Sequence, residues 1–165
     1  MPRKQTDFIV VHCSLSKPSM NVDAKVIDRW HREKGWLKIG YAKVILRDGT
    51  IEQGREDDEF QAHAVEINDR STSVCLVGGL SEDNKNEDNF TAEQWESLKE
   101  VLTNWVEKYP NARIIGHNEI NPKKTCPNFD VQDYLRNEDI PNYKYSWGTV
   151  GDLDIQEMKK ADVLQ

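Results

Sequence analysis

Phe8-Ile9-Val10-Val11-His12 is a short apolar run with polar residues on both sides. Its length and composition predict a strand rather than a helix. The run ends in a histidine, so a side chain that can bind a metal or transfer a proton lies at the end of a buried element. Cys13 follows directly, and because successive side chains of a strand alternate, we expect His12 and Cys13 to face opposite sides.

Further elements follow outward from this strand. Asp48-Gly49 is a strong hairpin signal, and Thr91 to Gln94 has the pattern of a capping box that opens a helix. The expected order is a strand 8–12, a helix from a cap at Asn21 or Asp23 to about Lys34, strands 41–46 and 50–53, a strand 71–79, a helix 91–109, a strand 113–116 and a helix 130–135. Such mixing predicts one α/β domain with a mixed sheet and about three flanking helices. We place this domain at residues 1–138 and an extension of uncertain structure at 139–165.

Composition excludes several classes of protein. A net charge of −7 and a pI near 5.1 argue against a general nucleic-acid binder. No apolar stretch approaches the roughly 20 residues of a membrane span, and the apolar run near the N-terminus is too short for an export signal. Three cysteines without such a signal indicate reduced thiols. We therefore expect synthesis in a cytoplasm.

Candidate metal ligands gather in Gly116-His-Asn-Glu-Ile-Asn-Pro-Lys-Lys-Thr-Cys-Pro127. Imidazole nitrogen and thiolate sulfur are ligands that Zn²⁺ prefers. His12, His117 and Cys126 would supply three ligands and leave one tetrahedral position open, which is typical of a catalytic site. The pattern favours a zinc hydrolase. Each histidine alone would more often be an ordinary polar residue.

Other polar side chains leave alternatives open. Glu119 could orient a ligand histidine or be a solvated loop charge. His31 is expected to be structural, and Cys75 to be a small apolar residue in a buried strand.

Five segments resemble a known family when taken in order: F-I-V-V-H-C-S from Phe8, W-H-R-E-K-G-W-L-K-I-G-Y from Trp30, R-D-G-T-I-E-Q-G-R from Arg47, V-C-L-V-G-G from Val74, and the stretch from Gly116 to Asp130. They look like the zinc-dependent N-acetylmuramoyl-L-alanine amidases, the family shared with peptidoglycan recognition proteins, and most of all its short phage lysozymes. The resemblance covers about residues 7–135.

The resemblance implies roles for particular residues. The zinc ligands would be His12, His117 and Cys126, with Tyr41 and Lys124 as catalytic residues beside the metal. His63 matches a position near the substrate groove. The reaction would be hydrolysis of the amide between the lactyl group of N-acetylmuramic acid and L-alanine in peptidoglycan.

The chain departs from the family pattern at Ala42, Lys43 and Ser73, which we expect to border the groove. These departures leave open a module that binds peptidoglycan without cleaving it. Some phage lysozymes of this type also inhibit a phage RNA polymerase, which makes that enzyme a possible partner. The preferred expectation is a monomeric phage lysis enzyme that reaches the cell wall after the membrane is permeabilised; a bacterial amidase that recycles wall fragments is a variant.

Overall fold

A five-stranded mixed sheet forms the centre of the computed structural model, which describes residues 2–145. The strand order is β3-β2-β4-β1-β5, with β1 at Phe8–Cys13, β2 at Lys43–Ile45, β3 at Ile51–Gln53, β4 at Ser71–Leu76 and β5 at Arg113–Gly116. Only β3 runs antiparallel to its neighbour; the other pairs are parallel. The single α/β domain with a mixed sheet is therefore confirmed.

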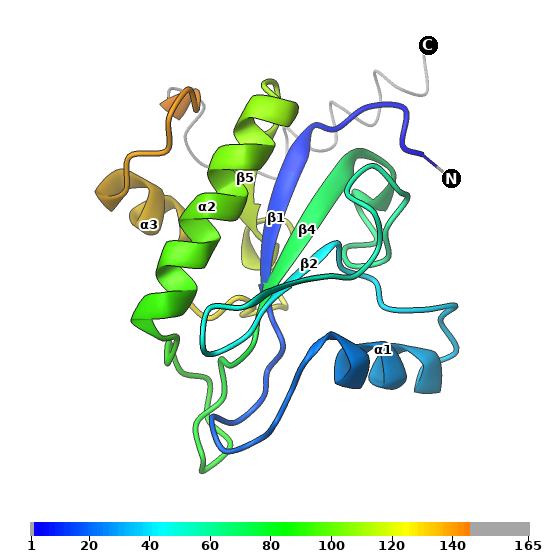
Figure 1. Ribbon diagram of the computed structural model, residues 1–165, viewed down its shortest axis with the longest axis vertical. Helices are drawn as coiled ribbons and strands as arrows, with labels where there is room; N and C mark the ends of the chain where they lie inside the picture. Colours follow the sequence, from blue (N-terminus) through cyan, green and yellow to red (C-terminus); the bar gives the residue numbers. More distant parts are fainter. Residues whose placement is uncertain (1, 146–165) are drawn as a thin grey trace.

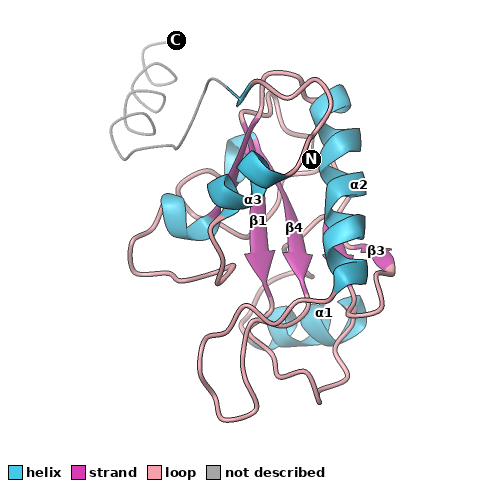
Figure 2. Cartoon of the chain, turned by 90° about the vertical axis from the view of Figure 1, so that its left-hand side faces the viewer, coloured by secondary structure: helices cyan, strands magenta, loops and turns pink. Residues whose placement is uncertain are grey.

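Helices cover the two faces of the sheet unequally. Helices α2 (Ala92–Lys108) and α3 (Val131–Asn137) pack on one face, and α1 (Ala24–Glu33) lies toward the other (Figures 1 and 2). The α2 side buries the larger apolar cluster, to which β1 contributes Ile9 and Val11. Because strand side chains alternate, His12 points to the opposite face, toward α1.

Local signals in the sequence set the N-terminal ends of the three helices. Thr91 caps α2 with the expected capping box, and Asp23 and Asp130 cap α1 and α3 through their side chains. The strands of the hairpin are shorter than expected, since Tyr41 and Thr50 lie outside the ladder. Strand β4 ends at Leu76 because the backbone of Gly78 and Gly79 has positive φ, a conformation that breaks an extended strand. Two short 3₁₀ turns, η1 (Asn68–Arg70) and η2 (His117–Glu119), were not expected.

Packing against the core continues beyond residue 138. Ile140 is buried in the α2-side cluster, and the hydroxyl of Tyr143 accepts a hydrogen bond of 3.0 Å from the backbone N–H of Ile114. The remainder of the expected extension, 146–165, lies outside the described residues. Within residues 2–145, no helix has both the length and the apolar character needed to cross a membrane.

Candidate metal centre

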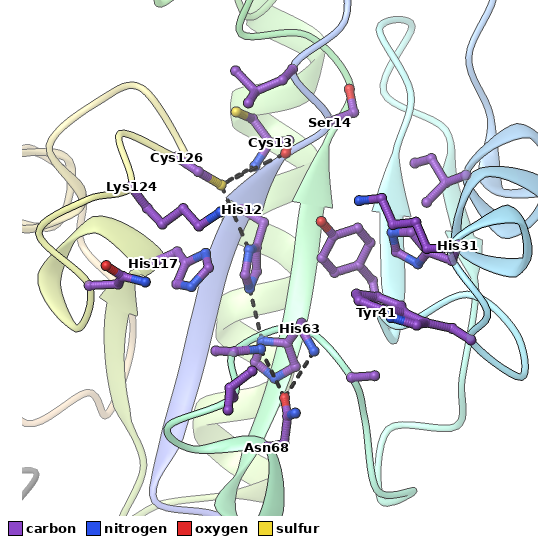
Figure 3. A pocket seen from close by; sticks show the side chains of 18 of the residues that line it. His12, Cys13, Ser14, His31, Tyr41, His63, Asn68, His117, Lys124 and Cys126 are labelled. Carbon is purple, nitrogen blue, oxygen red and sulfur yellow. Dashed lines mark hydrogen bonds between the residues drawn. The ribbon is translucent and has the colours of Figure 1, made fainter.

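His12, His117 and Cys126 converge at one end of the sheet (Figure 3). His12 lies in β1, His117 follows β5 directly, and the two strands are parallel neighbours, with Val11 opposite Gly116. The ends of parallel neighbours meet at the same edge, so register alone brings the two imidazoles together. One ligand atom of each of the three residues lies within 4.8 Å of the others. The expected convergence is thus observed.

The loop that carries Cys126 is tied to strand β1 and to the turn η2 that follows β5. The backbone N–H of Asn118 donates to the carbonyl of Cys126 at 2.8 Å, and the backbone N–H of Cys13 donates to its Sγ at 3.1 Å. Gly116 makes the close approach possible, because an added Cβ would lie 3.0 Å from Cδ of Pro127. Backbone contacts therefore place the sulfur opposite the histidines.

The donor set fits a zinc ion. Bond lengths of about 2.0 to 2.3 Å in a tetrahedral site place neighbouring N and S ligand atoms roughly 3.6 Å apart. The Nδ1 atom of His12 lies 3.7 Å from Sγ of Cys126. Among residues 2–145, no other histidine, cysteine or acidic side chain joins the three. The group can hold a metal and leave a coordination position for solvent.

Burial keeps the histidines neutral. Burial, with the nearby rings of His63 and His117, lowers the pKa of His12 well below its usual value. Burial also lowers the pKa of His117, where the opposing effect of Glu66 is offset by Lys124. Neutral imidazoles have the lone pair that a metal needs.

Cys126 differs from the histidines because it must lose a proton to bind a metal. A hydrogen bond with the Cys13 side chain, together with burial, raises the pKa of the Cys126 thiol. A metal ion would favour the thiolate, so metal binding should release a proton from this residue.

A cavity of about 650 Å³ opens beside the three candidate ligands. Helix α1 forms one wall through Ile27, Trp30 and His31. Tyr41 stands between this wall and the ligands, with its ring centroid 5.0 Å from that of His12. Burial raises the pKa of Tyr41 well above its usual value, so it remains a neutral hydrogen-bond donor.

Lys124 reaches the same cavity from the Cys126 loop. Its side chain is exposed, and its ammonium end points toward His12 and Cys126 (Figure 3). The two residues expected to be catalytic therefore lie beside the ligands, one from the α1 side and one from the loop after β5. Their roles stay predictions.

His63 and Glu119 lie near the ligands in different ways. His63 is only 9% exposed, and burial lowers its pKa to about 3. Glu119 is half-buried; its carboxylate accepts a 2.6 Å hydrogen bond from the backbone N–H of Gly116 and also contacts the side-chain amide of Gln132. It supports the backbone that leads into His117.

Two further residues of the site, Ser71 and Glu66, had no sequence signal that singled them out, and a third, His31, was expected to be structural. Ser71, in β4, bonds to His63. Glu66 lines the cavity and has one buried carboxylate oxygen without a hydrogen-bond partner. His31 is buried, accepts a 2.9 Å hydrogen bond from the backbone N–H of Gly40 and lies 5.3 Å from Tyr41 between ring centroids. A serine in an apolar strand or a glutamate in a loop carries no marker of function until the fold is known.

The departures from the family pattern lie outside the cavity wall, which corrects our expectation that they border it. Ala42 is buried in the α2-side cluster. The ammonium group of Lys43 donates to Gln53 Oε1, and the hydroxyl of Ser73 donates to Gln61 Oε1 at 2.8 Å. Tyr41 packs instead against the cluster of Ile27 and Val44 on the α1 side. The substitutions change packing and the sheet edge.

Comparison with known proteins agrees with this geometry. A family model described as N-acetylmuramoyl-L-alanine amidase matches residues 2–129. This chain belongs to that amidase family. The endolysin of Escherichia phage T7 is 43% identical over 138 residues, which cover 84% of this chain and 91% of that protein.

Solved structures show the same fold. The N-acetylmuramoyl-L-alanine amidase LysC from Clostridium intestinale is 27% identical with a TM-score of 0.72, and the match covers 85% of this chain and 87% of LysC. Drosophila PGRP-LB, at 21% identity and a TM-score of 0.68 over 88% of this chain and 87% of its own, shares the architecture. The expected enzyme class is confirmed: the chain is an N-acetylmuramoyl-L-alanine amidase that hydrolyses peptidoglycan.

Proposed function

We propose that this amidase is a zinc-dependent phage endolysin that cleaves the bond between N-acetylmuramic acid and L-alanine. The observation that carries the proposal is the convergence of two imidazoles and one thiol within 4.8 Å beside a cavity of about 650 Å³. When bound there, a zinc ion supplies activated water at neutral pH and polarises the scissile carbonyl. The protein must hold the substrate, stabilise the charge that develops on the carbonyl oxygen, and protonate the leaving amine.

Tyr41 is suited to stabilise the developing oxyanion. Its pKa is raised by burial, so the hydroxyl keeps its proton. A neutral donor fixed beside the reacting carbonyl stabilises negative charge that exists only in the transition state. The contact between its ring and that of His12 holds the phenol close to the ligands.

Lys124 brings a positive charge to the opposite side of the ligands. It is exposed and its side chain is long, so it can follow the substrate as the bond breaks. Its ammonium group can attract the oxyanion or deliver a proton to the amine of L-alanine. Together, Tyr41 and Lys124 can stabilise the oxyanion and protonate the leaving amine, two of the three tasks that fall to the protein.

Metal analysis combined with mass analysis of digested peptidoglycan tests the proposal. We expect close to one zinc per chain, loss of cleavage with a chelator, recovery with Zn²⁺, and release of stem peptides with a free L-alanine N-terminus. Cleavage that persists without metal would refute the mechanism. Products cut within the glycan or within the stem peptide would refute the bond assignment.

The biological setting follows from the relatives. The similarity to phage endolysins supports synthesis in an infected bacterial cell and access to the wall once the membrane is permeabilised. That the chain acts as a monomer stays a prediction. Sedimentation of the full chain checks the monomer, and lysis of cells with and without membrane permeabilisation checks the route. Inhibition of a phage RNA polymerase stays a prediction, which a transcription assay with the full chain addresses.

A further inference from the structure

His63 lies beside His12 (Figure 3) and next to Ser71 of strand β4, and both of its ring nitrogens bond to protein groups. Its Nδ1 is 2.8 Å from Nε2 of His12, and its Nε2 is 2.8 Å from Oγ of Ser71. With its ring buried and each nitrogen taken, His63 has no free polar atom for a substrate. It connects His12 of strand β1 to Ser71 of strand β4 instead.

The direction of each hydrogen bond can be derived from the far end of this chain of contacts. The hydroxyl of Ser71 is 2.7 Å from the carbonyl oxygen of Ile67, which can only accept, so the hydroxyl proton points there. A hydroxyl has one proton, and Oγ of Ser71 must therefore accept from Nε2–H of His63. A neutral imidazole has a single N–H, which leaves a lone pair on Nδ1 of His63. That lone pair accepts from Nε2–H of His12.

One tautomer of His12 follows. Its proton is held on Nε2, so its lone pair is on Nδ1, the atom that lies 3.7 Å from Sγ of Cys126. We call the hydrogen-bonded series of His12, His63 and Ser71 the relay. The relay thus directs the lone pair of His12 into the cluster of donor atoms. We propose that His63 and Ser71 are positioning residues that fix the tautomer and the ring orientation of His12 for metal binding through Nδ1. The inference deepens the proposed zinc site and rests on it.

Without the relay, His12 loses its constraint. Either ring nitrogen could then carry the proton, and part of the population would present N–H instead of a lone pair to the metal. Loss of the hydrogen-bond partner of a ligand histidine typically weakens metal binding by about 10- to 100-fold. Strand β1 would still place the ring, because its backbone pairs with β4 and β5 on both sides.

Zinc affinity of the full-length protein, measured by competition with a chelator, tests the relay. His63→Phe removes both bonds, and Ser71→Ala removes only the group that sets their direction. Ser73→Ala is the matched control, since Ser73 is also fully buried in β4 but bonds to Gln61 outside the relay. We expect about 10- to 100-fold weaker binding for His63→Phe, a smaller loss for Ser71→Ala, and wild-type affinity for Ser73→Ala.

A second measurement reads the tautomer directly. Long-range ¹H–¹⁵N correlation spectra of the wild-type protein should show the protons of His12 and His63 on Nε2, and the visible absorption of the Co²⁺-substituted protein should change in Ser71→Ala but not in Ser73→Ala. A proton on Nδ1 of His12, or zinc affinities of His63→Phe and Ser71→Ala equal to wild type, would overturn the relay while leaving the zinc site intact. Equal losses in Ser71→Ala and Ser73→Ala would reduce the effect to general packing and also overturn it. A wild-type chain that binds no zinc would overturn the proposed function itself.

Discussion

The two faces of strands β1 and β4 differ in the side chains that they bury, although neighbouring residues of the same strands supply them. Toward α2 the strands present Ile9, Val11, Val74 and Leu76, all fully buried. On the opposite face they bury the apolar Phe8, Val10 and Cys75, but also His12, which lies among Tyr41 and His63, and the serines of β4. Both faces therefore bury apolar area, and the face toward α1 also places donor atoms.

The α1 face keeps its buried polar groups by pairing them. Burying a hydroxyl or imidazole without a partner costs free energy, and a hydrogen bond offsets that cost. Ser71 bonds to Ile67 and His63, and Ser73 bonds to Gln61. The difference between the faces implies that stability and chemistry can be perturbed separately, even on the same strand.

The largest effect is expected from Cys126→Ser. A hydroxyl is a poor substitute for a thiolate ligand, and a catalytic metal supplies several kcal/mol of transition-state stabilisation, so kcat/KM should fall at least about 10³-fold. Zinc content and peptidoglycan cleavage measure the loss. Cys75→Ser makes the same change at a buried cysteine outside the donor set and should retain zinc. Full activity in Cys126→Ser would show that the donor atoms are not needed for cleavage, which contradicts the separate roles given to the two faces.

On the opposite face, Leu98→Ala should act on stability alone. Leu98 is fully buried between α2 and the sheet, and its truncation leaves a cavity. We expect the free energy of unfolding to fall by about 2–5 kcal/mol, measured by urea denaturation. The zinc content and the rate per folded molecule should match wild type. A drop in rate at full folding would show that the two faces are coupled.

The sequence predicted the elements and the donor set because both depend on local patterns. The cap at Thr91, the Asp48-Gly49 turn and the histidine at the end of an apolar run are visible without coordinates. The order of the strands brought His12 of β1 and His117, which follows β5, into one site. Resemblance to a family added Tyr41 and Lys124, which composition alone would not have distinguished.

The supporting contacts could not be predicted, because they depend on the paths of loops. His63 meets His12 across 51 residues, and Glu119 meets Gln132 on a separate helix. Ser71 is one of three polar residues at the start of a strand, and only the fold shows which of them faces the histidines. Neither spacing nor periodicity carries that information.

A smaller effect on the α1 face is expected from Tyr41→Phe. The substitution keeps the ring and its contact with His12 and removes only the hydroxyl. Loss of one donor to a developing oxyanion typically lowers kcat by about 10²–10³-fold. Zinc content should stay at the wild-type level, and so should KM if the hydroxyl acts only in the transition state. An unchanged kcat would remove Tyr41 from the catalytic residues.

The smallest effect concerns His31, whose contribution to stability depends on pH. Burial, with the charges of Lys34 and Arg55, lowers its pKa to about 4, below the ordinary value of 6.5 in an unfolded chain. Between these values the unfolded chain binds more protons, so the stability that neutral His31 contributes is complete above pH 6.5 and is lost as the pH falls toward 4. His31→Gln keeps an acceptor for Gly40 and removes this titration.

The measurement is the free energy of unfolding of the zinc-free protein between pH 6.5 and pH 4. His31→Gln should flatten the pH dependence by at most the slope of one proton, about 1.4 kcal/mol per pH unit. The three other histidines titrate in both proteins, so the difference isolates His31. Leu98→Ala should lower the whole curve without changing its slope, because the α2 face buries no titrating group at that position. If the free energy of unfolding had the same slope against pH in His31→Gln and Leu98→Ala, His31 would stabilise the cavity wall through packing alone. The two faces of the sheet would then contribute to stability in the same way.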